Sequence, residues 1–154
     1  ADEGVPQPSA GATLATPPAL KTLKVQHMNN ATVHNVKQTG WKNPVGYKTI
    51  PLGSIVHAGE LKNVTMTSDA KDQGWGGNCS YVYLNVTRGD VHLSKEVYVK
   101  LLRTSDYTKY TLSLIPPTTT MVEPGDVVSV RIGGSSSGCE AWIKNIKCDV
   151  TVFA

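Results

Sequence analysis

The sequence predicts an all-β protein, an antiparallel jelly-roll-like β-sandwich of about eight or nine strands that follows an extended N-terminal arm. Val, Thr, Tyr, Gly and Pro recur along the chain, whereas alanine is concentrated near its start. Turn signals come at short intervals, which is typical of sandwiches and barrels. The segment VVSVRI at 127–132 alternates apolar and mixed positions, as expected for a strand with one buried face.

Composition divides the chain into an arm at 1–19 and one domain at 20–154. The arm contains four prolines, two glycines and five alanines with almost nothing bulky to bury, so we expect a flexible or polyproline-like segment. Arms of this kind commonly contact adjacent copies in assemblies; the alternative is an arm that folds back over its own domain. The remaining length suits a single hydrophobic core.

Turn and alternation signals place nine strands. The motif EPGD at 123–126 is expected to turn, because Pro presets φ and Gly accepts positive φ. Trp142, Ile146, Cys148, Val150 and Val152 are expected to share one face of the last strand, with Lys144 as the exception. The expected strands are 20–27, 31–38, 47–58 (with Pro51 as an edge signal), 60–68, 80–88, 95–103, 110–115, 127–132 and 141–153.

Four N-glycosylation triplets, together with a first residue other than Met, favour a secreted or extracellular glycoprotein from which a signal peptide was removed, although a trimmed chain would begin in the same way. The acceptor asparagines are Asn30, Asn63, Asn78 and Asn85. Asn85 lies inside an expected strand, so it could carry sugar only if its side chain faces solvent.

The formal net charge of +3 is spread thinly, without a basic block, so no nucleic-acid partner is expected. The chain has no apolar run of the roughly 18 residues that a spanning helix needs, so we expect no membrane insertion.

Three cysteines leave one without a partner inside the chain. Cys79 and Cys139 lie in Gly- and Ser-rich loops and are expected to form a disulfide. Cys148 alternates with apolar neighbours and is expected to be a buried thiol. The alternative is three free thiols in an intracellular protein.

The stretch KDQGWGGNCSY at 71–81 has two interpretations. Its glycines permit a tight structural corner, in which Asp72 or Gln73 bonds nearby amides. Alternatively it is a sugar-binding rim, where Trp75 stacks on a pyranose while Asp72, Gln73 and Asn78 bond the hydroxyls. Trp41 and Tyr47 would contribute if their loop lies at the same end.

The segments TSDAKDQGWGG and GCEAWIKNIKCDVTV resemble motifs of galactose-binding-like jelly-roll domains, including the sugar-binding F-box-associated domains. The resemblance covers 67–152 loosely and rests on two short motifs. It implies a jelly-roll sandwich and carbohydrate contact at the loop rim. The export signals differ from the intracellular F-box relatives, so no ubiquitin-ligase role is carried over.

Catalytic patterns are absent from the sequence. The four histidines show no close metal-ligand spacing, no CxxC pair occurs, and GGSSSG lacks the context of a nucleophile elbow. We therefore expect a non-enzymatic protein without metal or cofactor. The first functional hypothesis is a structural subunit of an extracellular filament, coat or capsid-like assembly, whose arm contacts neighbouring copies as a homo-oligomer or polymer. The alternative is a lectin-like module that binds glycans in adhesion or recognition.

Overall fold

The computed structural model describes residues 21–37, 46–74, 79–134 and 139–154, and it shows the expected all-β sandwich of two antiparallel sheets. The predicted arm at 1–19 lies outside the described residues. Those residues form eleven strands, two more than the upper expectation, because β6 and β9 are two-residue pairings too short to leave a pattern in the sequence. None of the described segments forms a helix long and apolar enough to cross a membrane.

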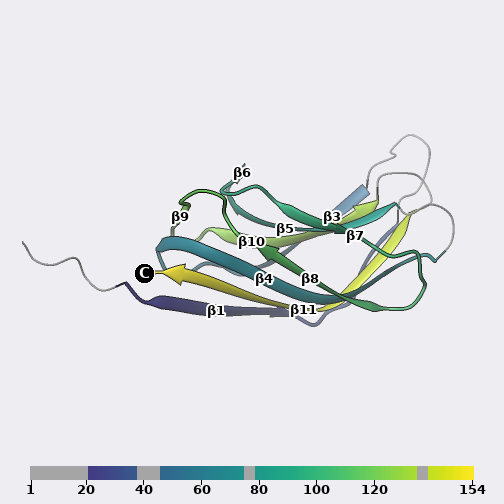
Figure 1. The fold of residues 1–154 in the computed structure, drawn as a ribbon. Coiled ribbons are helices and arrows are strands. Elements are labelled where there is room, and N and C mark those ends of the chain that lie inside the picture. Colours follow the sequence, from purple (N-terminus) through teal and green to yellow (C-terminus); the bar gives the residue numbers. More distant parts are fainter. Residues whose placement is uncertain (1–20, 38–45, 75–78, 135–138) are drawn as a thin grey trace, which may run out of the picture.

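The two sheets are formed by strands far apart in the sequence (Figure 1). Sheet A has the order β1-β11-β4-β8, with β2 also pairing with β11 and β9 with β4. Sheet B has the order β3-β10-β5-β6, with β7 also pairing with β5. The strands are β1 (Leu23–Asn30), β2 (His34–Lys37), β3 (Gly46–Ser54), β4 (Gly59–Asp72), β5 (Ser80–Arg88), β6 (Val91–His92), β7 (Val97–Lys100), β8 (Thr108–Leu114), β9 (Met121–Val122), β10 (Val127–Gly134) and β11 (Glu140–Phe153).

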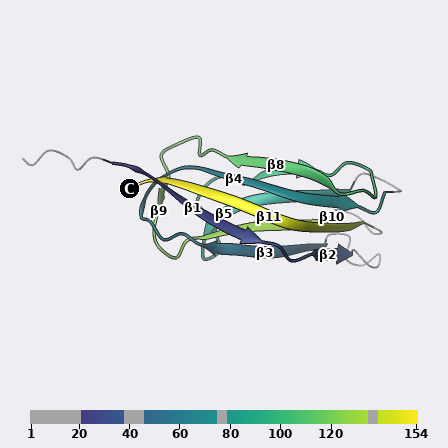
Figure 2. The same cartoon turned by 90° about the horizontal axis from the view of Figure 1, so that it is seen from below.

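Figure 2 views the sandwich from the side of sheet A, where β8, β4, β11 and β1 lie next to one another. The core between the sheets is aliphatic and includes Leu84 from β5, Ile132 from β10 and Val150 from β11, all fully buried. Val128, Val130 and Ile132 face this core as the alternation in β10 predicts. Each sheet therefore has one buried face and one outer face, and function must lie on the outer faces, the edges or the loops.

The last strand changes face partway along because of a β-bulge. Asn145 adopts a left-handed conformation with φ of 53°, and the register with β4 shifts between Lys144 and Lys147. Ile146, Cys148, Val150 and Val152 are buried as expected, but before the bulge Ala141 and Ile143 are the buried residues. Trp142 consequently lies half-buried on the outer face, which corrects its expected place in the core. An extra residue inverts the period-2 pattern.

The edge formed by β1 and β3 is closed by a side-chain amide. Gln26 donates from Nε2 to the carbonyl of Ser54 (2.7 Å), and its Oε1 accepts from the amide of Val56 (3.0 Å). The amide of Gln26 thus hydrogen-bonds to backbone groups of the other sheet, which the unpaired edge strands do not reach by themselves.

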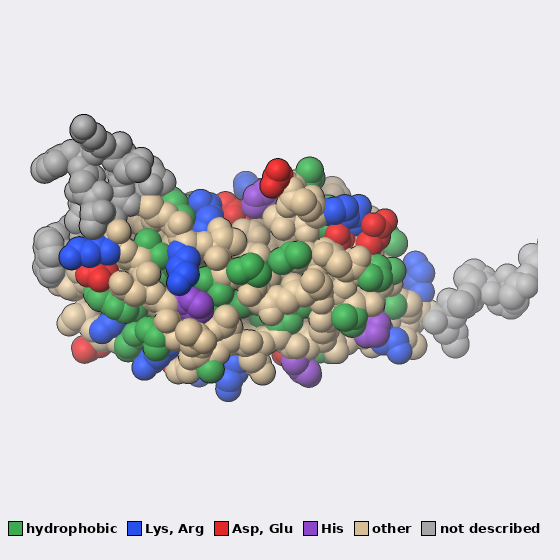
Figure 3. All heavy atoms as spheres, turned by 180° about the vertical axis from the view of Figure 1, so that it is seen from behind, with side chains coloured by type: hydrophobic (Ala, Val, Ile, Leu, Met, Phe, Trp, Pro, Cys, Tyr) green, Lys and Arg blue, Asp and Glu red, His purple; other side chains and the backbone are tan. Residues whose placement is uncertain are grey.

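Figure 3 shows the molecule from behind relative to Figure 1. Hydrophobic side chains are spread through the middle of this face, and most charged side chains lie near its borders.

The EPGD turn is confirmed, and it also anchors an ion pair. Gly125 has φ of 97°, and the amide of Glu123 donates to Asp126 Oδ2 (2.7 Å). Asp126 is 3% exposed and accepts two bonds from Arg88 at 2.8 and 2.9 Å. The Arg88 bonds hold the pKa of Asp126 below its usual range.

Candidate functional site

The described part of the glycine corner is structural. Asp72 is fully buried, and its Oδ1 accepts from the amides of Gly74 (2.8 Å) and Thr104 (3.2 Å). Gly74 has φ of 80°, and a Cβ there would lie 2.8 Å from the amide nitrogen of Ser105. The carboxylate of Asp72 has no access to solvent, which corrects the expectation that it contacts a sugar.

Of the other expected rim residues, the structure describes Gln73 and Tyr47. Gln73 is half-buried, and its Oε1 accepts from the amide of Glu140 (3.1 Å), so it ties the corner to β11. Tyr47 lies at the start of β3 in sheet B, and Asp72 lies at the end of β4 in sheet A, so the contribution of Tyr47 to the rim stays a prediction. Trp41, Trp75 and Asn78 lie outside the described residues.

The cysteines pair as the sequence suggests. Cys79 and Cys139 form a disulfide that links two chain positions 60 residues apart. Cys148 is a buried free thiol, and burial raises its pKa to about 12. A structural disulfide is typical of oxidising, extracellular compartments.

The sequons differ in accessibility. Asn30 and Asn63 are partly exposed, and Asn78 is not described. Asn85 is 5% exposed, and its Nδ2 donates to Glu96 Oε2 (3.3 Å). A glycan on this nitrogen would have to replace the bond to Glu96 and displace the groups that bury Asn85, which corrects the expectation of an N-glycan at Asn85.

Four tyrosine rings lie together on the outer face of sheet B; we call this set the tyrosine face. The ring centroids are 5.7 Å apart for Tyr47 and Tyr83, 6.1 Å for Tyr81 and Tyr83, 6.0 Å for Tyr81 and Tyr98, and 5.5 Å for Tyr83 and Tyr98. Tyr98 is the most open, at 62% exposure. The set is continuous because β3, β10, β5 and β7 are neighbours in sheet B.

An ion pair lies among these rings. The guanidinium of Arg131 is 4.1 Å from the ring centroid of Tyr83 and 4.5 Å from that of Tyr47. Its Nη2 donates to Glu96 Oε1 (2.8 Å). Burial, together with a hydrogen bond to Tyr47, raises the pKa of Tyr83 to about 12, so this phenol stays protonated at neutral pH. The face therefore combines aromatic surfaces with fixed donors and acceptors.

A glycine makes the packing of Tyr47 possible. A Cβ at Gly133 would overlap the carbonyl oxygen of Gly46 and would lie 2.7 Å from Cα and 2.8 Å from Cδ1 of Tyr47. The two residues are paired across β10 and β3. The missing side chain thus leaves room for β3 and for the Tyr47 ring.

A groove of about 430 Å³ borders the exposed end of the tyrosine face. Its walls come from the segment around β7 and from the turn after β8, and they are formed by Lys95, Glu96, Val97, Tyr98, Ile115 and Pro117. Ile115 is 69% exposed, so the groove continues the apolar surface of Tyr98. The volume falls within the range of small-ligand sites.

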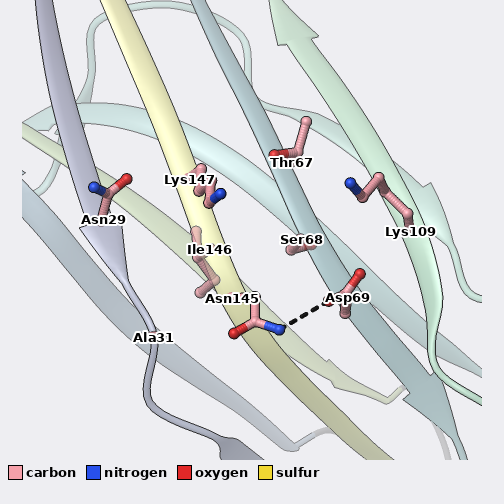
Figure 4. Close-up of a pocket in the computed structure, with 9 residues that line it drawn as sticks. All are labelled: Asn29, Ala31, Thr67, Ser68, Asp69, Lys109, Asn145, Ile146 and Lys147. Atoms are coloured by element: carbon pink, nitrogen blue, oxygen red, sulfur yellow. Dashed lines mark hydrogen bonds between the residues drawn. The ribbon is translucent and has the colours of Figure 1, made fainter.

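The outer face of sheet A has a different character. A hollow of about 370 Å³ lies at the bulge of β11 and is lined mainly by polar side chains (Figure 4). Asn145 Nδ2 donates to Asp69 Oδ2 (2.9 Å) across this hollow, while Lys109 and Lys147 extend from β8 and β11 on either side of β4. An adjoining hollow of about 290 Å³ includes His27, which is paired with Asp149.

Sequence reasoning named Tyr47 as a contributor to the rim at 71–81, and it singled out none of Tyr81, Tyr83 and Tyr98. The signal was present in SYVYLNV, where the tyrosines alternate with residues expected in the core. Within the described residues, no group of three or more His, Cys, Asp or Glu side chains is placed to hold a metal ion.

No family model matches the chain, and no curated protein matches it either. Among solved structures, the chain is similar to the VP2 subviral particle protein of infectious bursal disease virus, with a TM-score of 0.55 at 16% identity over 85% of this chain and 33% of the viral one. The Eiger TNF structure from S. frugiperda gives a TM-score of 0.50 at 12% identity, covering 86% of this chain and 93% of that one. A cyclase from Fischerella sp. TAU gives a TM-score of 0.52 at 13% identity, covering 91% of this chain and 80% of the cyclase.

These similarities establish the fold alone. The chain spans about a third of the length of the viral capsid protein that it matches. The jelly-roll-like sandwich implied by the resemblance to galactose-binding-like domains is confirmed, whereas membership of that family is not shown. Because one fold serves many functions, function has to be argued from the side chains described above.

Proposed function

We propose that this domain is a non-catalytic, secreted glycoprotein module that binds carbohydrate through the tyrosine face. The observation that carries the proposal is the continuous set of four tyrosine rings on an outer sheet face, with Tyr98 exposed to 62%. A cluster of aromatic side chains that reaches the solvent on an outer sheet face supports a role in binding. The Cys79–Cys139 disulfide supports an extracellular setting.

The chemistry of this face suits a sugar. The apolar face of a pyranose stacks on an aromatic ring, and its equatorial hydroxyls require donors and acceptors at the ring's edge. Arg131 and Glu96 provide both, and they are held in place by their ion pair and by the neighbouring rings. Because the guanidinium of Arg131 already lies over Tyr83 and Tyr47, the stacking surface is the exposed ring of Tyr98. Because these groups are already oriented, binding would cost little ordering entropy.

The test compares the affinities of the natural chain and of Tyr98→Ala for a panel of soluble neutral polysaccharides, measured by isothermal titration calorimetry. Removal of the most exposed ring should weaken binding about tenfold or more while the melting temperature changes little, because an exposed residue contributes little to the core.

Tyr107→Ala is the matched control, since Tyr107 lies beside Lys71 on the outer face of sheet A. It should leave neutral-glycan binding unchanged. Equal loss in both variants, or no binding to any neutral polysaccharide in the panel, would contradict the proposed site.

A second candidate function is that of a structural subunit of an extracellular assembly. The observation that favours it is an apolar patch where the expected arm joins the domain. Leu23 and Val25 are 55% and 51% exposed, and Leu23 pairs with Phe153 across β1 and β11. Such a patch, next to a Pro-rich segment, suits contact with a second copy of the chain.

Light scattering coupled to size exclusion tests this candidate. Deletion of 1–19 and the double variant Leu23→Ser/Val25→Ser should both yield a folded monomer, whereas Val91→Ser, at a residue 63% exposed elsewhere, should leave the assembly intact. An unchanged particle mass after the deletion would exclude the arm as the contact.

A further inference from the structure

The outer face of sheet A carries four lysines without acidic partners. Lys71, Lys109, Lys144 and Lys147 form no ion pair within the described part of the chain. Lys144 and Lys109 are paired with Asp69 on either side of β4, so their backbones lie about 10 Å apart across three strands. Lys71 on β4 and Lys147 on β11 each lie about 7 Å further along the sheet, which is the spacing of successive side chains on one face of a strand.

Two of these lysines are held by aromatic rings. The ammonium of Lys144 is 4.0 Å from the ring centroid of Tyr107, and that of Lys71 is 4.7 Å from Tyr107 and 4.9 Å from Trp142. Rings stabilise the cations without neutralising their charge. Positive charge is therefore concentrated and positioned at this end of the sheet.

The acidic group among these lysines is already engaged. Asp69 accepts a hydrogen bond from Asn145, whose left-handed backbone at the bulge brings its amide across the hollow (Figure 4). Lys144 and Lys109 flank this carboxylate across β4. Asp149, which lines the adjoining hollow with Lys147, is paired with His27. On either side of Lys147 the surface presents neutral hydroxyl and amide groups, from Thr67 on β4 and Asn29 on β1.

We propose that this surface is a second binding site, for an anionic polysaccharide bearing sulfate or carboxylate groups. Charge complementarity requires an anionic ligand. A polymer that carries both anionic groups and hydroxyls matches a face that presents both ammonium groups and neutral hydroxyl or amide groups. The site lies on the opposite sheet from the tyrosine face and does not depend on it.

The chemistry favours a saccharide over nucleic acid. Lys71 and Lys144 lie over the ring of Tyr107, and Lys71 also lies near the ring of Trp142, so these ring faces are not open to stack on a base. Stacking of bases, which drives single-strand binding, therefore has little surface here. If the lysines bound only isolated phosphate or sulfate charges, the site would not prefer a polysaccharide over DNA of matched charge. The experiment below compares the two.

The test uses the double variant Lys109→Gln/Lys147→Gln, at two exposed positions, with dextran sulfate and polygalacturonate as probes. Affinity for at least one of these polymers, measured at about 0.15 M salt, should fall about tenfold or more relative to the unmodified chain. The charge-matched control is Lys21→Gln/Lys24→Gln, at two exposed residues far from the bulge. It should keep its affinity, and uncharged dextran should not bind at this face.

Three outcomes would overturn the proposal. The first is an equal loss of affinity in the control variant, which would show attraction by net charge alone. The second is binding of duplex DNA of matched charge that is as tight as polymer binding and as sensitive to Lys109→Gln/Lys147→Gln. The third is absence of binding to both anionic polymers. Neutral-glycan binding should be unaffected by the lysine variant, and polyanion binding should be unaffected by Tyr98→Ala, so the two sites can fail independently.

Discussion

Replacing Asp126 by Asn removes one charge from a site that is almost closed to solvent. The carboxylate accepts three bonds: two from Arg88 at 2.8 and 2.9 Å, and one from the amide of Glu123 at 2.7 Å. An amide side chain of the same shape retains one acceptor oxygen, so at least one charge-assisted bond is lost. Such bonds contribute about 1.5–3 kcal/mol when buried, and the partial exposure of this pair places the expected loss near 2 kcal/mol.

The pH dependence distinguishes this cause from a general packing defect. The pKa of Asp126 is lowered by Arg88 in the folded state, so the carboxylate stabilises the fold fully above its unfolded pKa. That contribution is lost as the pH falls through the lowered folded value. Urea unfolding should therefore show a difference of about 2 kcal/mol between the natural chain and Asp126→Asn at pH 7, and a smaller difference at about pH 2.

Glu123→Gln is the matched control. Glu123 Oε2 is 3.7 Å from Arg88 and the side chain is 66% exposed, so its loss should change stability by less than about 0.5 kcal/mol. A difference for Asp126→Asn that is the same at both pH values, or absent at pH 7, would refute the role assigned to this ion pair.

Three further predictions concern the disulfide, the glycine beneath Tyr47 and the free thiol. Replacing both Cys79 and Cys139 by Ala should lower the free energy of unfolding by about 4 kcal/mol, as expected for a loop of 60 residues, and unchanged urea unfolding would contradict this. Gly133→Ala should destabilise the fold by about 1–3 kcal/mol, and it should also reduce neutral-glycan binding because the added methyl displaces Tyr47. A variant with normal stability and binding would show that β3 shifts to accommodate the methyl. The pKa of Cys148 is raised to about 12 by burial, so the thiol should react with Ellman's reagent at about pH 8 only after denaturation, and rapid reaction of the native protein would disprove its burial.

Some features of the fold follow from local sequence. Alternation in VVSVRI placed β10 with Val128, Val130 and Ile132 inward, and the structure agrees. The EPGD turn was equally predictable, because Pro fixes its own φ and Gly permits a positive φ, whatever the distant parts of the chain do.

The last strand shows where local sequence was insufficient. Its apolar positions identified a strand, but the bulge at Asn145 decides that Trp142 faces outward while Ile146 faces the core. A bulge depends on the partner strand β4, which lies far away in sequence. Lys144, the exception to the expected pattern, was the one local sign of it.

The candidate sites depend almost entirely on strand order. The sequence by itself determined the longer strands, the EPGD turn and most residues able to form a core, since these follow from the conformational preferences and polarity of neighbouring residues. Only the tertiary structure decided that Tyr47, Tyr81, Tyr83 and Tyr98 form one surface, and that Asp72 and Asn85 are buried. The reason is that in an antiparallel sandwich neighbouring strands come from distant parts of the chain, so side chains become neighbours through pairing that no local pattern records.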